Sequence, residues 1–148
     1  MLETNNINLK KNDIIFSEGE INKDLFLIDK GKVLAFVTRR TEVTPVAYFE
    51  AGDFIGELSF FDKHPRSANL VCLEDTSLHV YPYERSLEQF PKWSITLAES
   101  ITKKIRYYDD ILKNKGIRRK NEEGLKPLSI ETQRHYFKLL DDYKNSEK

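Results

Sequence analysis

The feature that most constrains the fold is a change of hydrophobic pattern near Pro82. Before it, β-branched and aromatic residues form short runs separated by turn residues, and after it apolar residues recur at helical spacing. The short runs cover residues 14–16, 25–28, 33–38, 43–49 and 76–81. Evenly spaced short strands predict a jelly-roll barrel over about residues 8–81. We therefore expect a mainly β fold with helices at its C-terminal end.

A short helix over residues 83–90 and a long one over 92–113 are predicted after the barrel. Pro82 suits a helix start, and Pro91 ends the short helix. The long helix carries an apolar seam at three- and four-residue spacing, formed by Ala98, Ile101, Ile105, Tyr108 and Leu112. A helix packed on its own barrel needs a similar stripe, and Ile95, Leu97 and Ile111 allow both faces to be used. Both interpretations stay open on spacing alone.

The segment after the long helix divides into a polar linker and a last helix. Residues 114–127 are polar, with three basic residues followed, after Asn121, by two acidic ones. The last helix is expected to begin after Ser129, a good N-cap, and to end near residue 143. Its apolar side chains recur on one face, at Tyr136, Phe137, Leu140 and Tyr143. We expect one domain over 1–113, then a linker and helix over 114–148.

Composition argues against several classes of function. The 24 basic residues balance 24 acidic ones, which argues against a dominant DNA-binding surface. Cys72 has no partner for an internal disulfide. The sequence shows neither an apolar leader nor an apolar run of membrane-spanning length. We therefore expect a cytoplasmic protein that does not contact a membrane. The histidines are scattered without metal-ligand spacing. We expect no metal site, no cofactor, no catalytic residue and no enzyme.

The stretch 52–71, GDFIGELSFFDKHPRSANLV, contains the groups needed to hold a cyclic phosphate. Backbone N–H groups from Gly56 to Ser59, at the start of a short helix, can face an anion. Arg66 offers a planar, permanently charged fork for phosphate oxygens. Glu57 can accept a hydrogen bond from a sugar hydroxyl. Taken singly, each residue also has an ordinary structural explanation, and it is their order that favours a ligand site.

This stretch resembles the phosphate-binding cassette of the cyclic nucleotide-binding domain family, which the bacterial catabolite activator shares with regulatory subunits of cAMP-dependent protein kinase. The resemblance covers residues 8–113, with Asn12 where glycine is common, a residue that also tolerates a left-handed turn. It implies that Glu57 binds the ribose 2′-hydroxyl and Arg66 the cyclic phosphate. The full set of implied ligand-binding residues is Gly56, Glu57, Leu58, Ser59, Arg66, Ser67 and Ala68. Because the Arg-Ser-Ala run is shared with the catabolite activator, cAMP is expected in preference to cGMP.

The resemblance also implies a role for the long helix. In bacterial relatives this helix pairs two protomers, so a homodimer through 92–113 is expected. Its Tyr108 and Asp109 occupy candidate base-contacting positions. Too few residues follow Leu112 for the winged helix-turn-helix of the transcription factors. The expected function is a stand-alone cyclic nucleotide sensor that signals to an unknown protein partner, and the alternative is a non-ligand-binding adaptor on the same fold.

Overall fold

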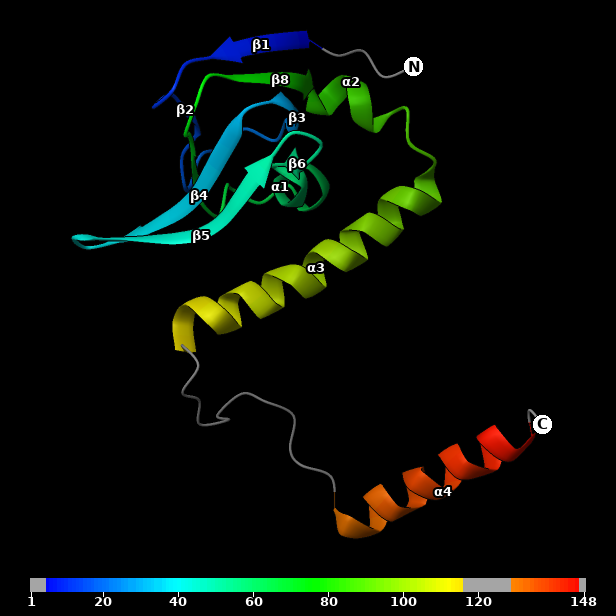
Figure 1. The fold of residues 1–148 in the computed structure, drawn as a ribbon. Coiled ribbons are helices and arrows are strands. Elements are labelled where there is room, and N and C mark those ends of the chain that lie inside the picture. Colours follow the sequence, from blue (N-terminus) through cyan, green and yellow to red (C-terminus); the bar gives the residue numbers. More distant parts are fainter. Residues whose placement is uncertain (1–4, 116–128, 147–148) are drawn as a thin grey trace. The chain divides into compact units, whose positions relative to one another are not determined.

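A computed structural model describes residues 5–115 and 129–146 of the chain. The chain divides into two compact units, 1–111 and 112–148. The strands of the described part are β1 (Asn5–Leu9), β2 (Ile14–Phe16), β3 (Leu25–Lys30), β4 (Lys32–Arg39), β5 (Glu42–Glu50), β6 (Phe54–Ile55), β7 (Asn69–Cys72) and β8 (Thr76–Tyr81). The helices are α1 (Glu57–Asp62), α2 (Tyr83–Leu87), α3 (Lys92–Lys115) and α4 (Ile130–Ser146). The expectation of a mainly β fold with C-terminal helices is confirmed (Figure 1).

The strands form two antiparallel four-stranded sheets with the orders β1-β8-β3-β6 and β2-β7-β4-β5. Consecutive strands often lie in different sheets, so the chain crosses repeatedly between them, as in a jelly roll. The exception is the hairpin of β4 and β5, which extends beyond the other strands in Figure 1. Its register slips between Ala35 and Phe36, so Val46 is left without a direct partner as a bulge. This bulge lies beside the cavity described below.

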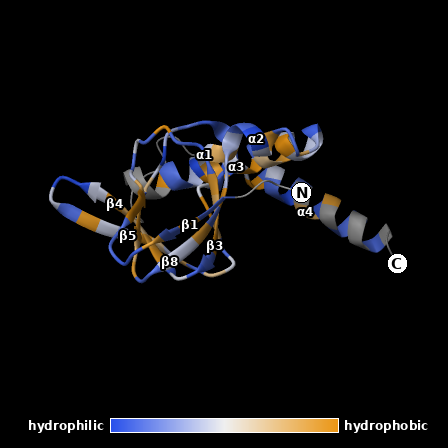
Figure 2. Cartoon of the chain, turned by 90° about the horizontal axis from the view of Figure 1, so that it is seen from above, coloured by the Kyte–Doolittle hydropathy of each residue, from blue (hydrophilic) through white to orange (hydrophobic). Residues whose placement is uncertain are grey.

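The core lies between the two sheets. Alternate residues of β4 are buried, namely Val33, Ala35 and Val37, as period-2 side-chain alternation requires. Val33 and Ala35 meet apolar residues of the other strands in a cluster of Phe16, Phe26, Ile28, Val33, Ala35, Ile55, Leu70 and Leu78. In Figure 2 hydrophobic segments lie along several of the strands, and many of the connecting loops are hydrophilic. Burial of these apolar side chains stabilises the barrel that carries the site.

The observed elements extend and correct the expected ones. The five predicted strand runs did not include β1, β6 or β7, and Asn12 has the left-handed conformation expected of it, with φ 76°. The short helix ends at Leu87 rather than at 90. Helix α3 continues through Lys115, so the first residues of the expected linker are helical, and 116–127 lie outside the described residues. Among the described residues, no helix is long and apolar enough to cross a membrane.

Helix α4 begins as expected after Ser129, whose Oγ accepts a hydrogen bond from the N–H of Thr132 at 3.1 Å. Of its predicted apolar face, Phe137 is 67% exposed. The side chains of Tyr136, Leu140 and Tyr143 lie outside the described residues.

Candidate functional site

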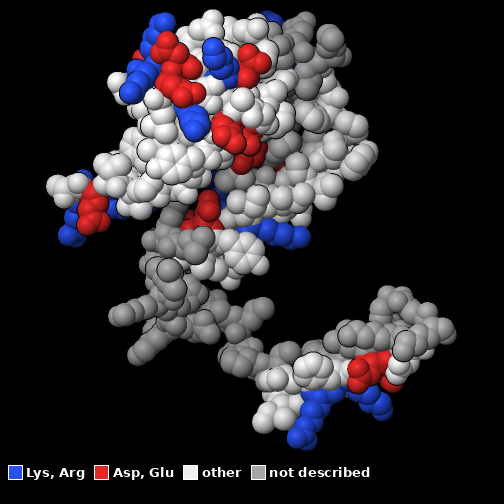
Figure 3. All heavy atoms as spheres, viewed as in Figure 1, with Lys and Arg blue, Asp and Glu red and all other residues white. Residues whose placement is uncertain are grey.

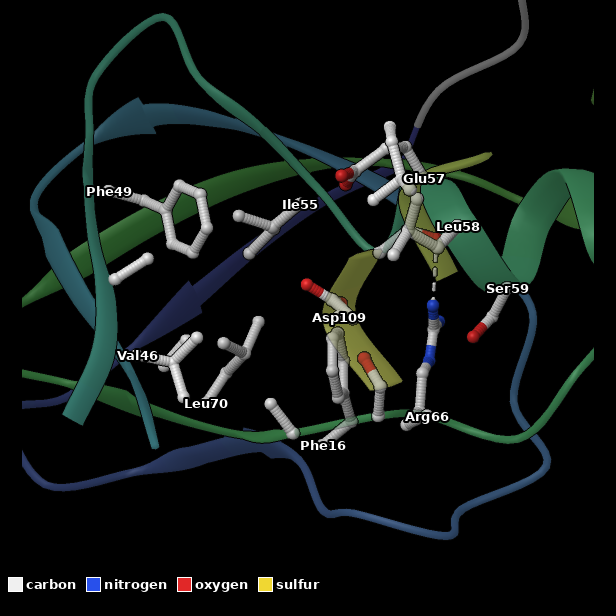
Figure 4. A pocket seen from close by; sticks show the side chains of 16 residues that line it. Phe16, Val46, Phe49, Ile55, Glu57, Leu58, Ser59, Arg66, Leu70 and Asp109 are labelled. Carbon is white, nitrogen blue, oxygen red and sulfur yellow. Dashed lines mark hydrogen bonds between the residues drawn. The ribbon is translucent and has the colours of Figure 1, made fainter. Parts of the chain in front are cut away.

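The 1–111 unit contains a cavity of about 200 Å³ between the barrel and α3. All of the cassette residues expected to bind a ligand line it: Gly56, Glu57, Leu58, Ser59, Arg66, Ser67 and Ala68. The rest of its wall is mostly apolar and comes from the barrel and α3: Phe16, Ala35, Val46, Ala47, Phe49, Ile55, Leu70, Ile105 and Asp109 (Figure 4). The cavity thus has a polar end at the cassette and an apolar end at the barrel.

The polar end is built around the first turn of α1. Gly56 precedes this helix with φ 81°, a left-handed conformation that favours glycine. The first helical hydrogen bond runs from the N–H of Phe60 to the carbonyl of Gly56 at 3.2 Å. The N–H groups of Leu58 and Ser59 precede that bond, so neither has an acceptor within the helix. These groups lie at the cavity wall, where a bound oxygen anion could accept from them.

Arg66 is 3% exposed, so its guanidinium is almost fully withdrawn from water. Its Nη1 donates to the carbonyl oxygen of Gly56 at 2.9 Å. Its Nη2 donates to Asn22 Oδ1 at 2.7 Å and to the carbonyl oxygen of Asp24 at 2.6 Å. The guanidinium also stacks over the ring of Phe16, 4.1 Å from its centroid. All of these partners are formally neutral groups.

Two further observations show that the positive charge of Arg66 is poorly compensated. Nε is buried and has no hydrogen-bond partner, and no carboxylate of the described part of the chain forms an ion pair with this side chain. Burial lowers the pKa of the Arg66 guanidinium to about 10, against smaller opposing effects of nearby acidic residues. A buried cation of this kind is stabilised by an anion that enters the cavity.

Glu57 provides the acidic group beside this cation. Burial raises the pKa of its carboxyl, because the charged form loses water. A hydrogen bond from the backbone N–H of Glu57 itself and the positive charges of Arg106 and Arg66 oppose this pKa shift, while the negative charge of Asp109 adds to it. The carboxylate is therefore held at the wall of the cavity in a position where a hydroxyl donor would stabilise its charged form.

The two candidate base-contacting residues of α3 lie in different surroundings. Asp109 lines the cavity, and Figure 4 shows its carboxylate directed into it. Tyr108 does not line it: this side chain is 63% exposed and packs edge-on against Tyr107. Ile105, one helical turn before Asp109, also lines the cavity. The structure thus brings one of the two residues into the site.

Helix α3 is tied to the cassette by an ion pair that the sequence did not reveal. Arg106 donates from Nε to Asp62 Oδ2 at 2.7 Å and from Nη2 to Asp62 Oδ1 at 3.1 Å. Its Nη2 is also 3.4 Å from Ser59 Oγ. Burial alone would raise the pKa of Asp62, but hydrogen bonds from Arg106 and from the N–H of His64 outweigh it and lower that pKa.

Asn22, Asp24, Asp62 and Arg106 are therefore site residues that the motif reading missed. A helical periodicity argument could have found Arg106, which precedes Asp109 by three positions on the same helix. No comparable local signal marks Asn22 or Asp24. In the described ranges 5–115 and 129–146, no group of His, Cys, Asp and Glu side chains is placed to hold a metal ion.

Comparisons with known proteins agree with this geometry. The family described as "Cyclic nucleotide-binding domain" matches residues 6–91. The cyclic AMP receptor protein of Thermus thermophilus is 30% identical over 99 residues, which are 64% of this chain and 46% of the receptor. A cAMP-dependent protein kinase regulatory subunit of Neurospora crassa is 35% identical over 57 residues, 38% of this chain and 14% of the subunit. The chain thus spans less than half the length of these relatives.

Solved structures show the same architecture. The EAL enzyme Bd1971 in its cAMP-bound form superposes with a TM-score of 0.63 at 30% identity, over 74% of this chain and 31% of that one. Its cGMP-bound form gives a TM-score of 0.64 at 28% identity, over 74% and 30% of the two chains. Because the family match covers more than half of the residues, the chain belongs to the cyclic nucleotide-binding domain family.

Proposed function

We propose that this protein is a cyclic nucleotide sensor whose ligand occupies the cavity between the barrel and α3. The observation that carries the proposal is the buried guanidinium of Arg66, which has only neutral hydrogen-bond acceptors and a buried Nε without a partner. A cyclic phosphate supplies the missing negative charge. The role proposed is binding, with no reaction catalysed.

The remaining walls suit the other parts of a nucleotide. The carboxylate of Glu57 accepts from the ribose 2′-hydroxyl, and this bond offsets the cost of burying its charge. The apolar wall formed by Val46, Phe49 and Leu70 suits the faces of a purine. The relatives whose structures contain cAMP and cGMP support this class of ligand.

We favour cAMP over cGMP as the ligand. The support comes from the Arg66-Ser67-Ala68 run, which is shared with the catabolite activator, and from similarity to a cyclic AMP receptor protein. Asp109 can accept from the adenine amino group or from the guanine N1 and N2 donors. Competition between the two nucleotides in wild type and in Asp109→Asn measures its contribution to this preference.

We further propose that the sensor is a homodimer paired through α3. Helix α3 carries an apolar stripe of Trp93, Leu97, Ile101, Ile105 and Tyr108, between 39% and 71% exposed, of which Ile105 also lines the cavity. Acidic and basic side chains are interspersed on the face of the barrel shown in Figure 3, which favours output through protein contacts over a dominant DNA-binding surface. Ile101→Glu should yield monomers in light scattering, whereas Thr96→Glu, exposed outside the stripe, should leave dimers intact.

The binding proposal is tested by calorimetric titration of nucleotide-free protein with cAMP and with cGMP. Arg66→Ala should weaken binding by about 2–3 kcal/mol, the scale for losing a buried charge-assisted contact. The matched control is Arg39→Ala, since Arg39 is an exposed arginine that pairs with Glu18 away from the cavity. Wild-type protein that binds neither nucleotide would refute the sensor and favour a non-ligand-binding adaptor.

A further inference from the structure

A two-point ion pair joins α1 and α3 beside the cavity. Both of its side chains are largely buried, with exposed fractions of 16% for Arg106 and 13% for Asp62. The guanidinium faces the carboxylate with two nitrogens, Nε at 2.7 Å and Nη2 at 3.1 Å. A two-point contact of this kind fixes orientation as well as distance, because both planar groups must stay aligned.

This pair connects two parts of the site that are far apart in the sequence. Asp62 is the last residue of α1, the cassette helix whose first turn provides the phosphate-facing N–H groups. Arg106 lies on α3, between Ile105 and Asp109, and both of those residues line the cavity. A shift of α3 relative to α1 would therefore move the wall that these two residues form.

Few other polar contacts in the described part of the chain tie α3 to the cassette. Arg106 Nη2 lies 3.4 Å from Ser59 Oγ, and α3 also carries the half-buried Ile95 and Ala98 and the buried Thr102. Apolar contacts tolerate sliding, whereas a bidentate ion pair does not. The register of α3 over the cavity thus depends strongly on Asp62.

We propose that Asp62 is a positioning residue of the binding site, which acts through Arg106 to hold Ile105 and Asp109 of α3 over the cavity. The proposal rests on the proposed function, because the wall that is positioned is the wall of the nucleotide site. Asp62 itself does not line the cavity and is not expected to touch the ligand.

The test compares Asp62→Asn with wild type and with Asp110→Asn, which removes an exposed carboxylate from α3. The first measurement is hydrogen–deuterium exchange over residues 100–111 in ligand-free protein. Exchange should be faster in Asp62→Asn than in either control. Arg106→Lys, which keeps the charge but loses the planar fork, should give a smaller change of the same sign.

The second measurement is affinity for cAMP and for base-free ribose 3′,5′-cyclic phosphate. Asp62→Asn should weaken cAMP binding roughly tenfold, the scale of coupling between contacting residues. It should leave the base-free probe within about twofold, because that probe reaches the cassette but not the α3 wall. General damage to the fold would weaken both ligands alike and would overturn the proposal.

The two proposals fail in different ways. If wild-type protein binds neither ligand, the sensor function is wrong, and the exchange data alone decide whether Asp62 holds α3. If wild type binds but Asp62→Asn has unchanged exchange and unchanged cAMP affinity, the positioning role is wrong while the sensor stands. Should Asp62→Asn fold poorly, the Arg106→Lys variant provides both measurements in its place.

Discussion

Two arginines contact the two ends of the short cassette helix, and their charges are compensated in opposite ways. Arg106 meets the carboxylate of Asp62 in a two-point ion pair. Arg66 is more deeply buried, at 3% exposure, yet its partners are carbonyl and amide oxygens, and its Nε has none. The first charge is neutralised within the protein, and the second is not.

This difference separates a structural charge from a functional one. A buried ion pair is costly to break from one side, because the remaining charge is left without a partner. A buried cation without a counter-charge destabilises the empty protein. An anionic ligand removes this destabilisation when it binds, so the protein binds anions more tightly than neutral ligands. Methionine is long, flexible and uncharged. Replacing each arginine by methionine therefore removes the charge at both sites, one where a carboxylate pairs with the arginine and one where none does.

Arg66→Met should have the largest effect, and on binding. We expect cAMP affinity to fall by about 3 kcal/mol, because a buried positive charge at the cavity that has no ion pair is lost. The free energy of unfolding of the empty protein should change less than the binding free energy does, because removal of an uncompensated buried charge offsets the loss of its hydrogen bonds to Gly56, Asn22 and Asp24. Titration calorimetry and urea unfolding measure the two quantities. A large loss of stability would remove the contrast between the two arginines.

Arg106→Met should act mainly on stability. It leaves the carboxylate of Asp62 largely buried without its ion pair, which should lower the free energy of unfolding by about 2–3 kcal/mol. Urea unfolding of Arg106→Met and of the double variant with Asp62→Leu checks the cause. The double variant should recover much of the loss, because no unpaired charge remains. If it does not recover, packing rather than charge explains the effect.

A smaller effect is expected from a pair of glycines. Gly56 and Gly52 both have left-handed backbones, with φ 81° and 96°, so alanine costs about 1 kcal/mol at either. At Gly56 the added Cβ would also lie 2.6 Å from Arg66 Nη1 and 3.0 Å from the carbonyl oxygen of Asp24, whereas at Gly52 it would meet nothing. Gly56→Ala should therefore cost about 1–2 kcal/mol more in urea unfolding, and it alone should weaken cAMP binding.

Most strands of the barrel could be predicted because each has a recognisable pattern in its own short stretch of sequence. The strands over 14–16 and 76–81 were predicted with the observed bounds, and both contain β-branched or aromatic residues in short runs. Strand β1 is polar except for Ile7 and Leu9, and it forms because it pairs with β8. Strand β6 has only two residues, too few for a periodic pattern. Both depend on partners elsewhere in the chain.

The site shows the same limit. The seven cassette residues lie within one short stretch of sequence, so their common position at the cavity could be predicted from their order. The residues that hold Arg66 and Asp62 could not, because Asn22 and Arg106 are each 44 positions away from the partners they contact. Such contacts depend on how the strands and α3 pack in three dimensions, and a local sequence motif does not predict them.

Glu57→Gln should give the smallest effect and the most specific pH dependence. Burial raises the pKa of Glu57, so the folded state binds its proton more tightly than the unfolded state does. Wild type is therefore penalised as the pH rises through the interval between the unfolded pKa and the raised folded one, and the penalty remains at neutral pH. The variant lacks it and should be about 0.5–1 kcal/mol more stable than wild type at pH 7. Below the unfolded pKa, the variant and wild type should be equally stable in urea unfolding.

The same variant should bind cAMP more weakly, because the glutamine lacks the negative charge that accepts the ribose hydroxyl. Its affinity should therefore fall while its stability rises. A variant that is less stable than wild type at pH 7 would contradict this expectation. It would show that the charge of Glu57, like that of Asp62, is stabilised by groups of the protein, and that of these charges only that of Arg66 needs a ligand to compensate it.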